Sequence, residues 1–138
     1  MKRFLLDTNV VSETRKSRPH GAVIGWLDAL AREQVFFSSL VFWELQVGIE
    51  STREQDQAKA QEIEAWVDDM VLTQQILPMD EVSFRECAHL MQGKPQDLFE
   101  DAMIAATARI YGLTVATRNE RDFALFDVPV LNPFRVPS

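Results

Sequence analysis

The sequence predicts an α/β protein in which helices surround a mostly parallel central sheet, as in an α/β/α sandwich. Short runs of β-branched and aromatic residues alternate along the chain with longer segments whose apolar residues recur at helical spacing. Strands separated by helices pair in parallel, because each helix carries the chain back across the sheet. With 138 residues, 46% of them hydrophobic, the chain is long enough for a single domain, 1–138, with its own core.

The first half of the chain is expected to supply two strands and four helices. KRFLL predicts a strand at residues 2–6 and VFFSS a second strand at 35–39, because both runs are short and rich in apolar residues. Ser39 is the expected N-cap of the next helix, since a serine side chain can accept a hydrogen bond from a free N–H group there. The apolar spacing predicts helices at 9–14, 22–32, 39–51 and 53–74.

The second half is expected to supply three strands and two long helices. The strands are predicted at 76–79, 113–117 and 128–133. One helix should begin after the cap Asp80 and end at Gly93, and the other, from 97, should end at Gly112. A turn or short helix is expected at 119–126. In parallel sheets of this kind, ligands gather at the carboxyl ends of the strands.

The composition limits the possible classes of function. The net charge of −7, from 14 basic and 21 acidic residues, argues against coating of nucleic acid by bulk electrostatic attraction. It does not exclude a nuclease, because metal ions can reverse the sign of a local site. No apolar run is long enough to span a bilayer and no secretion signal is visible, so the cytoplasm is the expected compartment. Cys87, the only cysteine, is expected to be a buried thiol.

Four acidic residues lie in unusually apolar surroundings. Asp7 follows the strand, Glu44 lies within LVFWELQVGI, Asp101 opens the run AMIAA, and Asp122 follows LTVAT across a turn. A buried ionised carboxylate is unfavourable unless it is paired or bound to a metal. Mg²⁺ and Mn²⁺ prefer oxygen ligands, so carboxylates from separate elements can hold one or two such ions for phosphoryl chemistry.

Each of these acids also has a purely structural explanation. Asp7 could cap the helix that follows it, and Glu44 could face solvent or form a salt bridge. Asp101 could be a first-turn residue favoured by the helix dipole, and Asp122 could be an ordinary turn residue. The joint placement of all four at strand ends and helix starts is what favours a functional site.

The order of these motifs resembles the PIN-domain family of metal-dependent ribonucleases, and within it the VapC-type toxins of bacterial toxin–antitoxin pairs. LLDTNVVSE is similar to the family's first strand and first acid, and SSLVFWELQVG to the segment that carries the second acid. EDAMIAATARIYGLTVATRNERDF is similar to the part from the third acid to the fourth position, and VLNPF to the C-terminal ending. The resemblance covers nearly the whole chain and implies a PIN-like sandwich.

The resemblance also implies a site and a reaction. The acids at the family's catalytic and metal-binding positions are Asp7, Glu44, Asp101 and Asp122. The polar residues at supporting positions are Asn9, Thr117 and Asn119. Asp7 and Asp101 would be the principal ligands of Mg²⁺ or Mn²⁺, and the reaction would be hydrolysis of RNA phosphodiester bonds.

Further charged residues lie close to these motifs in sequence. Asp97 and Glu100 precede Asp101, but the apolar run that begins after Asp101 favours Asp101 as the inward-pointing acid. Basic residues follow the first motif and flank the fourth, namely Arg15, Lys16, Arg18, Arg118 and Arg121. If their loops meet at the strand ends they could hold RNA phosphates, although solvated loop charges would give the same pattern.

The family resemblance implies protein partners as well. A cognate antitoxin is expected to place a basic residue in the acidic site, and the net charge of −7 favours a basic binder. A homodimer is expected because Trp26, Phe42 and Trp43 add apolar bulk to the early helices. No membrane partner is expected.

Two other classes of protein fit part of the sequence. A phospho-accepting receiver domain is also a small α/β protein with an acidic metal pocket. That family resembles this chain less, because it has two adjacent acids where Thr8 follows Asp7, and a lysine where this chain has Arg118. The other class is a PIN-fold interaction module without turnover, against which the four intact acids argue.

Overall fold

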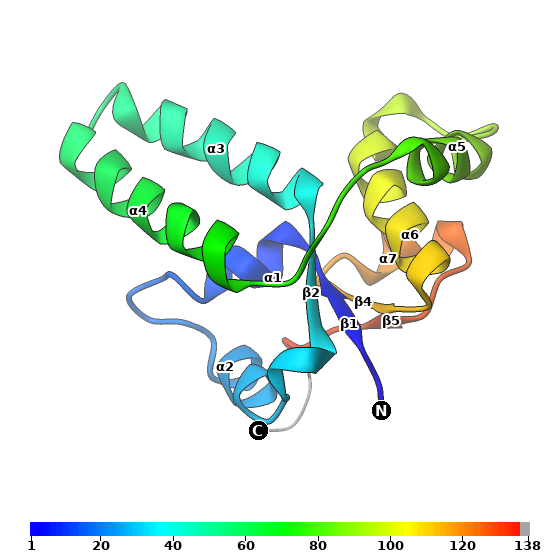
Figure 1. Ribbon diagram of the computed structural model, residues 1–138, viewed down its shortest axis with the longest axis horizontal. Helices are drawn as coiled ribbons and strands as arrows, with labels where there is room; N and C mark the ends of the chain where they lie inside the picture. Colours follow the sequence, from blue (N-terminus) through cyan, green and yellow to red (C-terminus); the bar gives the residue numbers. More distant parts are fainter. Residues whose placement is uncertain (136–138) are drawn as a thin grey trace.

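A parallel β-sheet forms the centre of the molecule, and the computed structural model describes residues 1–135 (Figure 1). The last three residues of the expected domain, 136–138, lie outside that range. The strands within it are β1 (Phe4–Leu6), β2 (Val35–Ser38), β3 (Ile76–Leu77), β4 (Thr114–Ala116) and β5 (Val130–Leu131). Their order across the sheet is β3-β2-β1-β4-β5, and each neighbouring pair is parallel. The predicted α/β fold is therefore confirmed.

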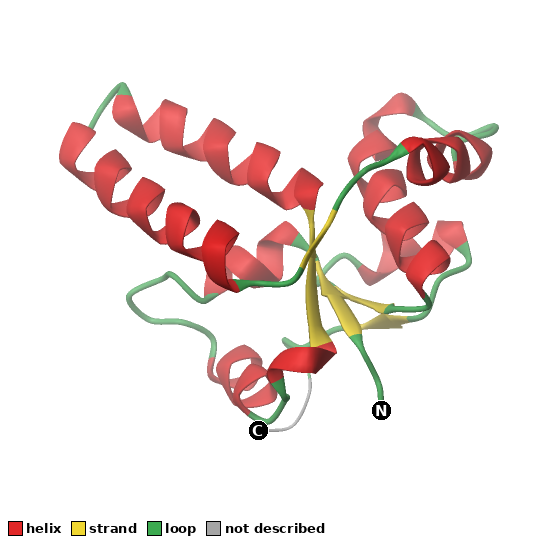
Figure 2. Cartoon of the chain, viewed as in Figure 1, coloured by secondary structure: helices red, strands yellow, loops and turns green. Residues whose placement is uncertain are grey.

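Helices pack on both faces of this sheet, as Figure 2 shows. The α-helices between residues 1 and 135 are α1 (Thr8–Glu13), α2 (Gly21–Asp28), α3 (Ser39–Arg53), α4 (Gln57–Thr73), α5 (Glu81–Leu90), α6 (Phe99–Tyr111) and α7 (Glu120–Phe123). Short 3₁₀ turns are η1 (Arg32–Gln34), η2 (Gln96–Leu98) and η3 (Ala124–Phe126). None of the helices in this part of the chain is long and apolar enough to cross a lipid bilayer.

The central strand β1 divides the core between the two faces. Side chains alternate across a strand, so Phe4 and Leu6 point to one face and Leu5 to the other. Phe4 and Leu6 pack with the apolar sides of α1 to α4. Leu5 packs with α5, α6 and α7, where Cys87 is a buried thiol, as expected. Because β1 is buried on both faces, it carries a continuous apolar run and no alternation.

The carboxyl ends of the three middle strands lie at the same edge of the sheet. Leu6 at the end of β1 pairs with Phe37 of β2 on one side and Ala116 of β4 on the other. The N–H of Asp7 donates to the carbonyl of Ala116 at 2.9 Å, so the residue after β1 is still held by β4. The segments that follow these strands are thereby brought together.

Several helix boundaries differ from the sequence-based expectation. Ser38, and not Ser39, caps α3, since the Ser38 hydroxyl accepts from the N–H of Leu40 at 3.2 Å. α3 continues to Arg53, where the next helix was expected to begin, and α4 starts only after its own cap, Asp56. Apolar spacing did not locate this break because both helices are amphipathic up to the turn that joins them.

Caps explain the remaining ends of the long helices. Asp80 caps α5 as expected, by accepting from the N–H of Ser83 at 2.9 Å. α5 stops at Leu90, before the expected end at Gly93, which adopts a positive φ of 74° in the turn that follows. Gly112 ends α6 as predicted, with a left-handed φ of 67° that a side chain would disfavour.

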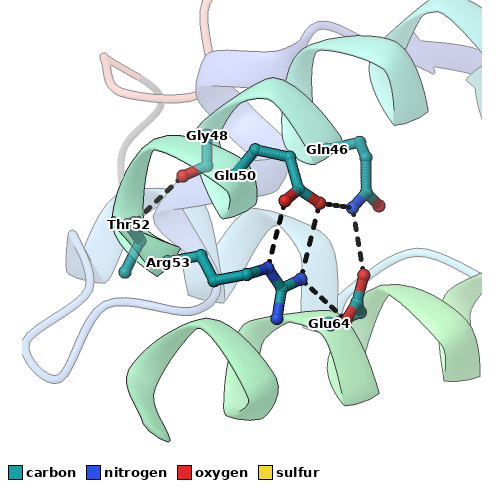
Figure 3. A network of polar contacts seen from close by, with 6 residues as sticks. All are labelled: Gln46, Gly48, Glu50, Thr52, Arg53 and Glu64. Atoms are coloured by element: carbon teal, nitrogen blue, oxygen red, sulfur yellow. Dashed lines mark hydrogen bonds and ion pairs between the residues drawn. The ribbon is translucent and has the colours of Figure 1, made fainter. Parts of the chain in front are cut away.

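A polar network fastens α3 to α4 (Figure 3). The guanidinium of Arg53 donates to Glu50 at 3.0 Å and crosses to Glu64 on α4 at 2.9 Å. The side-chain amide of Gln46 donates to the same two carboxylates, at 2.7 and 3.0 Å. These contacts hold the outer turns of the two helices side by side, and α3 carries Glu44 nearer its start.

Two of the three aromatic residues that suggested a homodimer belong to the core of the subunit. Trp26 packs edge-on against Phe4, with ring centroids 4.9 Å apart, and Phe42 packs against the same buried cluster. Trp43 is different, because 64% of its surface is exposed. Of these three residues, Trp43 alone therefore remains as an argument for an interface.

Candidate active site

Asp7 is buried at the carboxyl end of β1, with only 5% of its surface exposed. Its Oδ1 accepts from the N–H of Thr8 at 2.8 Å and so caps α1. Its Oδ2 accepts from the hydroxyl of Thr117 at 2.7 Å and from the amide of Asn9 at 3.1 Å. Burial raises the pKa of Asp7, and these three hydrogen bonds oppose that rise. Asp7 is thus both a helix cap and a member of a larger polar site.

The loop after β4 is held against Asp7 by residues at the expected supporting positions. The Thr117 hydroxyl, fully buried, donates to Asp7 and accepts from the N–H of Asn119 at 2.9 Å. The Asn9 side chain bridges the two segments, because its Oδ1 accepts from the N–H of Arg118 at 3.2 Å. Asn119 contributes to this network through its main chain, while Asn9 and Thr117 contribute through their side chains.

Glu44 reaches the same region from α3. Its Oε1 accepts from the hydroxyl of Thr8 at 2.8 Å, which links the second acid to the residue after the first. The pKa of Glu44 is raised to about 7. Burial is the largest cause, the hydrogen bond from Thr8 opposes it, and the neighbouring carboxyls of Glu100 and Asp7 add to the rise. No ion pair involves Glu44 within residues 1–135, so the salt-bridge explanation fails for the described chain.

Asp101, in the first turn of α6, faces the other acids. Burial, together with repulsion from the negative charges of Asp7, Asp122 and Glu100, raises the pKa of Asp101 to about 6. Asp97 contributes the smallest part of this repulsion and is exposed. The preference for Asp101 over Asp97 as the inward acid is consistent with this geometry.

The structure adds two residues that the motifs did not single out. Thr8 joins Asp7 to Glu44, as described above, and Glu100 lies against Glu44. At the start of a helix, neighbours in sequence point in different directions, so Glu100 and Asp101 can face different acids. In the sequence, Glu100 was visible only as one of three closely spaced acids, at 97, 100 and 101. Their spacing alone could not show which of them faces α3.

Asp122 lies on the short helix α7, beside a second kind of surface. An open hollow of about 710 Å³ is lined by Arg118, Asn119, Glu120, Arg121, Asp122 and Arg135. The earlier basic group is not part of it, because Arg15, Lys16 and Arg18 line another hollow with Lys59. The basic residues at 15–18 and at 118–121 therefore line two separate hollows. Their positions in the sequence had allowed a single shared surface.

The acids carry negative charge without protein counter-charge. Within residues 1–135, none of the ion pairs includes Asp7, Glu44, Asp101 or Asp122. A divalent cation fits this donor set, since the available ligands are hard carboxylate oxygens whose mutual repulsion a cation would relieve. In the described chain, however, no three such side chains already converge closely enough to form a metal site. The carboxylates would have to close around an ion.

Comparison with known proteins relates the whole arrangement to one family. The family described as PIN domain matches residues 4–129. Toxin FitB of Neisseria gonorrhoeae is 35% identical over 95% of this chain and 98% of its own length. VapC ribonuclease Y4jK of Sinorhizobium fredii is 33% identical over 95% of this chain and 97% of its own length.

Solved structures show the same similarity in three dimensions. The crystal structure of FitAcB from Neisseria gonorrhoeae superposes with a TM-score of 0.84 at 34% identity, over 96% of this chain and 99% of that one. DNA-bound VapBC from Salmonella typhimurium superposes with a TM-score of 0.77 at 25% identity, again over 96% and 99% of the two chains. The likeness therefore extends over nearly the full length of both proteins.

Proposed function

The chain belongs to the PIN-domain family, and on this basis we propose that it is a Mg²⁺- or Mn²⁺-dependent endoribonuclease and the toxin of a toxin–antitoxin pair. The observation that carries the proposal is the set of mutually repelling acids without a protein counter-charge, in which Asp7 follows β1, Glu44 lies on α3 and Asp101 opens α6. Such a set is suited to hold cations against a phosphodiester. We expect this nuclease to act in the cytoplasm and as a single domain.

The proposed roles follow from the position of each side chain. Asp7 and Asp101 would be the principal ligands, and Glu44 and Asp122 would complete the site. When bound, the ion would supply Lewis-acid catalysis, by making water a better nucleophile and by neutralising charge on the phosphoryl oxygens. Thr117 and Asn9 fix the orientation of the Asp7 carboxylate, because both donate to its Oδ2. Thr8 does the same for Glu44.

Metal-dependent cleavage of RNA by the purified protein tests the proposed reaction. RNA should be cut in the presence of Mg²⁺ or Mn²⁺, and the products should disappear when a chelator is added in excess. A folded protein that binds RNA but shows no turnover with either ion would instead support a PIN-fold interaction module. The receiver-domain alternative has no support from the family match.

An inhibitory protein partner forms the second half of the proposal. Related structures are described as a toxin–antitoxin complex from Klebsiella pneumoniae and as DNA-bound VapBC from Salmonella typhimurium. For this chain, we expect the antitoxin to insert an arginine or lysine among the acids, where it would replace the charge of the metal. A homodimer is proposed as well, with the exposed face of α3 around Trp43 and Val47 available for contact.

Growth of a host cell measures the effect of such a pair. Expression of the wild-type chain alone should stop growth, and co-expression with the protein encoded beside it should restore growth. The matched control is the Asp101→Asn chain at equal abundance, which should be tolerated because a metal ligand is missing. Normal growth with abundant, folded wild-type protein would contradict the toxin proposal.

A further inference from the structure

We propose that the hollow beside Asp122 binds the phosphate backbone of the RNA next to the acidic site, through the guanidinium groups of Arg118 and Arg121. The inference rests on the proposed ribonuclease function, and it identifies the surface that would hold the substrate. Three arginines against two acids, Glu120 and Asp122, leave this hollow with one positive charge, although the whole chain carries −7.

Arg118 has a fixed position relative to the acids. Its main-chain N–H donates to Asn9, whose amide donates in turn to Asp7. The next residue is held as well, because the N–H of Asn119 donates to the Thr117 hydroxyl, which in turn donates a hydrogen bond to Asp7. A phosphate held by Arg118 would therefore lie at a defined distance from the first acid, as a substrate-positioning group requires.

The Arg118 guanidinium stacks on an aromatic ring supplied by the C-terminal segment. The Cζ atom of Arg118 lies 3.8 Å from the centroid of the Phe134 ring. The Phe134 ring is itself packed edge-on against His20, with ring centroids 5.4 Å apart. Stacking uses the face of the guanidinium and leaves its N–H groups free at the edge. Among residues 1–135, no carboxylate forms an ion pair with Arg118. This orientation suits a planar, bidentate contact with a phosphate.

The other two arginines border the same hollow from different segments. Arg135 is held by Glu120 at 3.0 Å, and the amide of Asn132 donates to the same carboxylate at 3.1 Å. Arg121 is exposed on α7, next to Asp122, and no ion pair within the described chain includes it. Glu120 thus ties the C-terminal segment to α7 while Arg121 and Arg118 keep their charges available.

Electrostatics explain why a phosphate-binding surface is needed at this place. The acids beside the hollow repel a polyanion, and a metal ion at the acids offsets only the charge around the reacting phosphate. Arginines beside Asp122 would attract the neighbouring phosphates without occupying the acidic site. RNA backbone is therefore the ligand that the combination of adjacent acids and free guanidinium groups favours.

Salt-dependent RNA binding tests the proposal directly. Binding of a fluorescein-labelled, single-stranded oligoribonucleotide is measured by anisotropy with Asp101→Asn protein in chelator, from about 50 to 200 mM salt. Introducing Arg118→Gln and Arg121→Gln together should make the slope of log K against log salt shallower by about 0.7 for each lost phosphate contact. The matched control is Arg85→Gln, which removes one exposed arginine from α5 and should leave the slope unchanged.

Cleavage kinetics and a conservative variant separate the inference from the proposed reaction. In otherwise wild-type protein with Mg²⁺, the double substitution should raise KM more than it lowers kcat, and Arg118→Lys should restore only part of the binding. If wild-type protein cleaves RNA but the double variant keeps the slope of Arg85→Gln, the inference is overturned and the ribonuclease proposal stands. Absence of RNA binding by the parent protein would overturn the inference too. An unchanged slope with loss of inhibition by the antitoxin would assign the hollow to the protein partner instead.

Discussion

Asp101→Asn should reduce metal-dependent RNA cleavage by about 100-fold or more. Loss of a group that merely supports a metal ligand already costs about 10- to 100-fold, so loss of a proposed ligand should cost at least as much. The substitution keeps the size of the side chain and removes one of the charges that repel Asp7 and Asp122. We therefore expect a folded protein with lower activity, measured as the initial rate of cleavage at saturating Mg²⁺.

Asp97→Asn is the matched control for this experiment. Asp97 lies four residues earlier, is exposed, and contributes least to the repulsion felt by Asp101. Its replacement removes the same charge by the same chemistry and should change the rate by less than about twofold, as surface changes usually do. Equal losses from the two variants would show that the inward acid had been assigned wrongly.

Without metal, the protein should become less stable as the pH rises from 5 to 8. In the folded state the pKa of Glu44 is raised from 4.5 to about 7, and that of Asp101 from 3.8 to about 6. Between the unfolded and folded values the native state binds more protons than the unfolded chain, so its stability is lost as the pH rises. Both side chains are partly exposed, and we expect screening to limit the loss to about 1 kcal/mol, or about 4 °C in Tm.

Thermal melts of wild-type protein and Glu44→Gln in chelator measure this effect. Glutamine can still accept from the Thr8 hydroxyl but does not ionise, so the variant should melt higher than the wild type at pH 8 and show a weaker pH dependence. Mg²⁺ or Mn²⁺ should raise the Tm of the wild type by binding the folded state. A wild-type Tm that climbs steadily from pH 5 to pH 8 in chelator would contradict the proposed repulsion.

The sequence predicted the fold well because its parallel strands are buried. FLL and VFFSS are short apolar runs without competing helical periodicity, and the glycine at 112 defines a helix end by its backbone conformation. The end of α3 was harder to predict, since amphipathic spacing continues on both sides of the turn at 54–56. Local caps such as Asp56 decide such ends, and a chain has more potential caps than actual ones.

The candidate site was predictable only as far as it depends on strand ends. Asp7 and Thr117 follow neighbouring parallel strands, so their proximity follows from the topology. The contact between Glu44 and Glu100 depends on how α3 and α6 face each other, which spacing within each helix does not determine. The stacking of Arg118 on Phe134 likewise joins two loops, and no periodic pattern relates them.

The position of β1 in the sheet has a consequence for protein synthesis. β1 leaves the ribosome long before its neighbour β4, since Asp7 and Thr117 are separated by 110 residues. A nascent chain that has reached only α5 already contains Asp7 and Glu44 but lacks Asp101, Thr117 and Asp122. Premature termination before α6 would thus release an incomplete site, and the proposed nuclease could become active only after α7, which carries Asp122, had been translated.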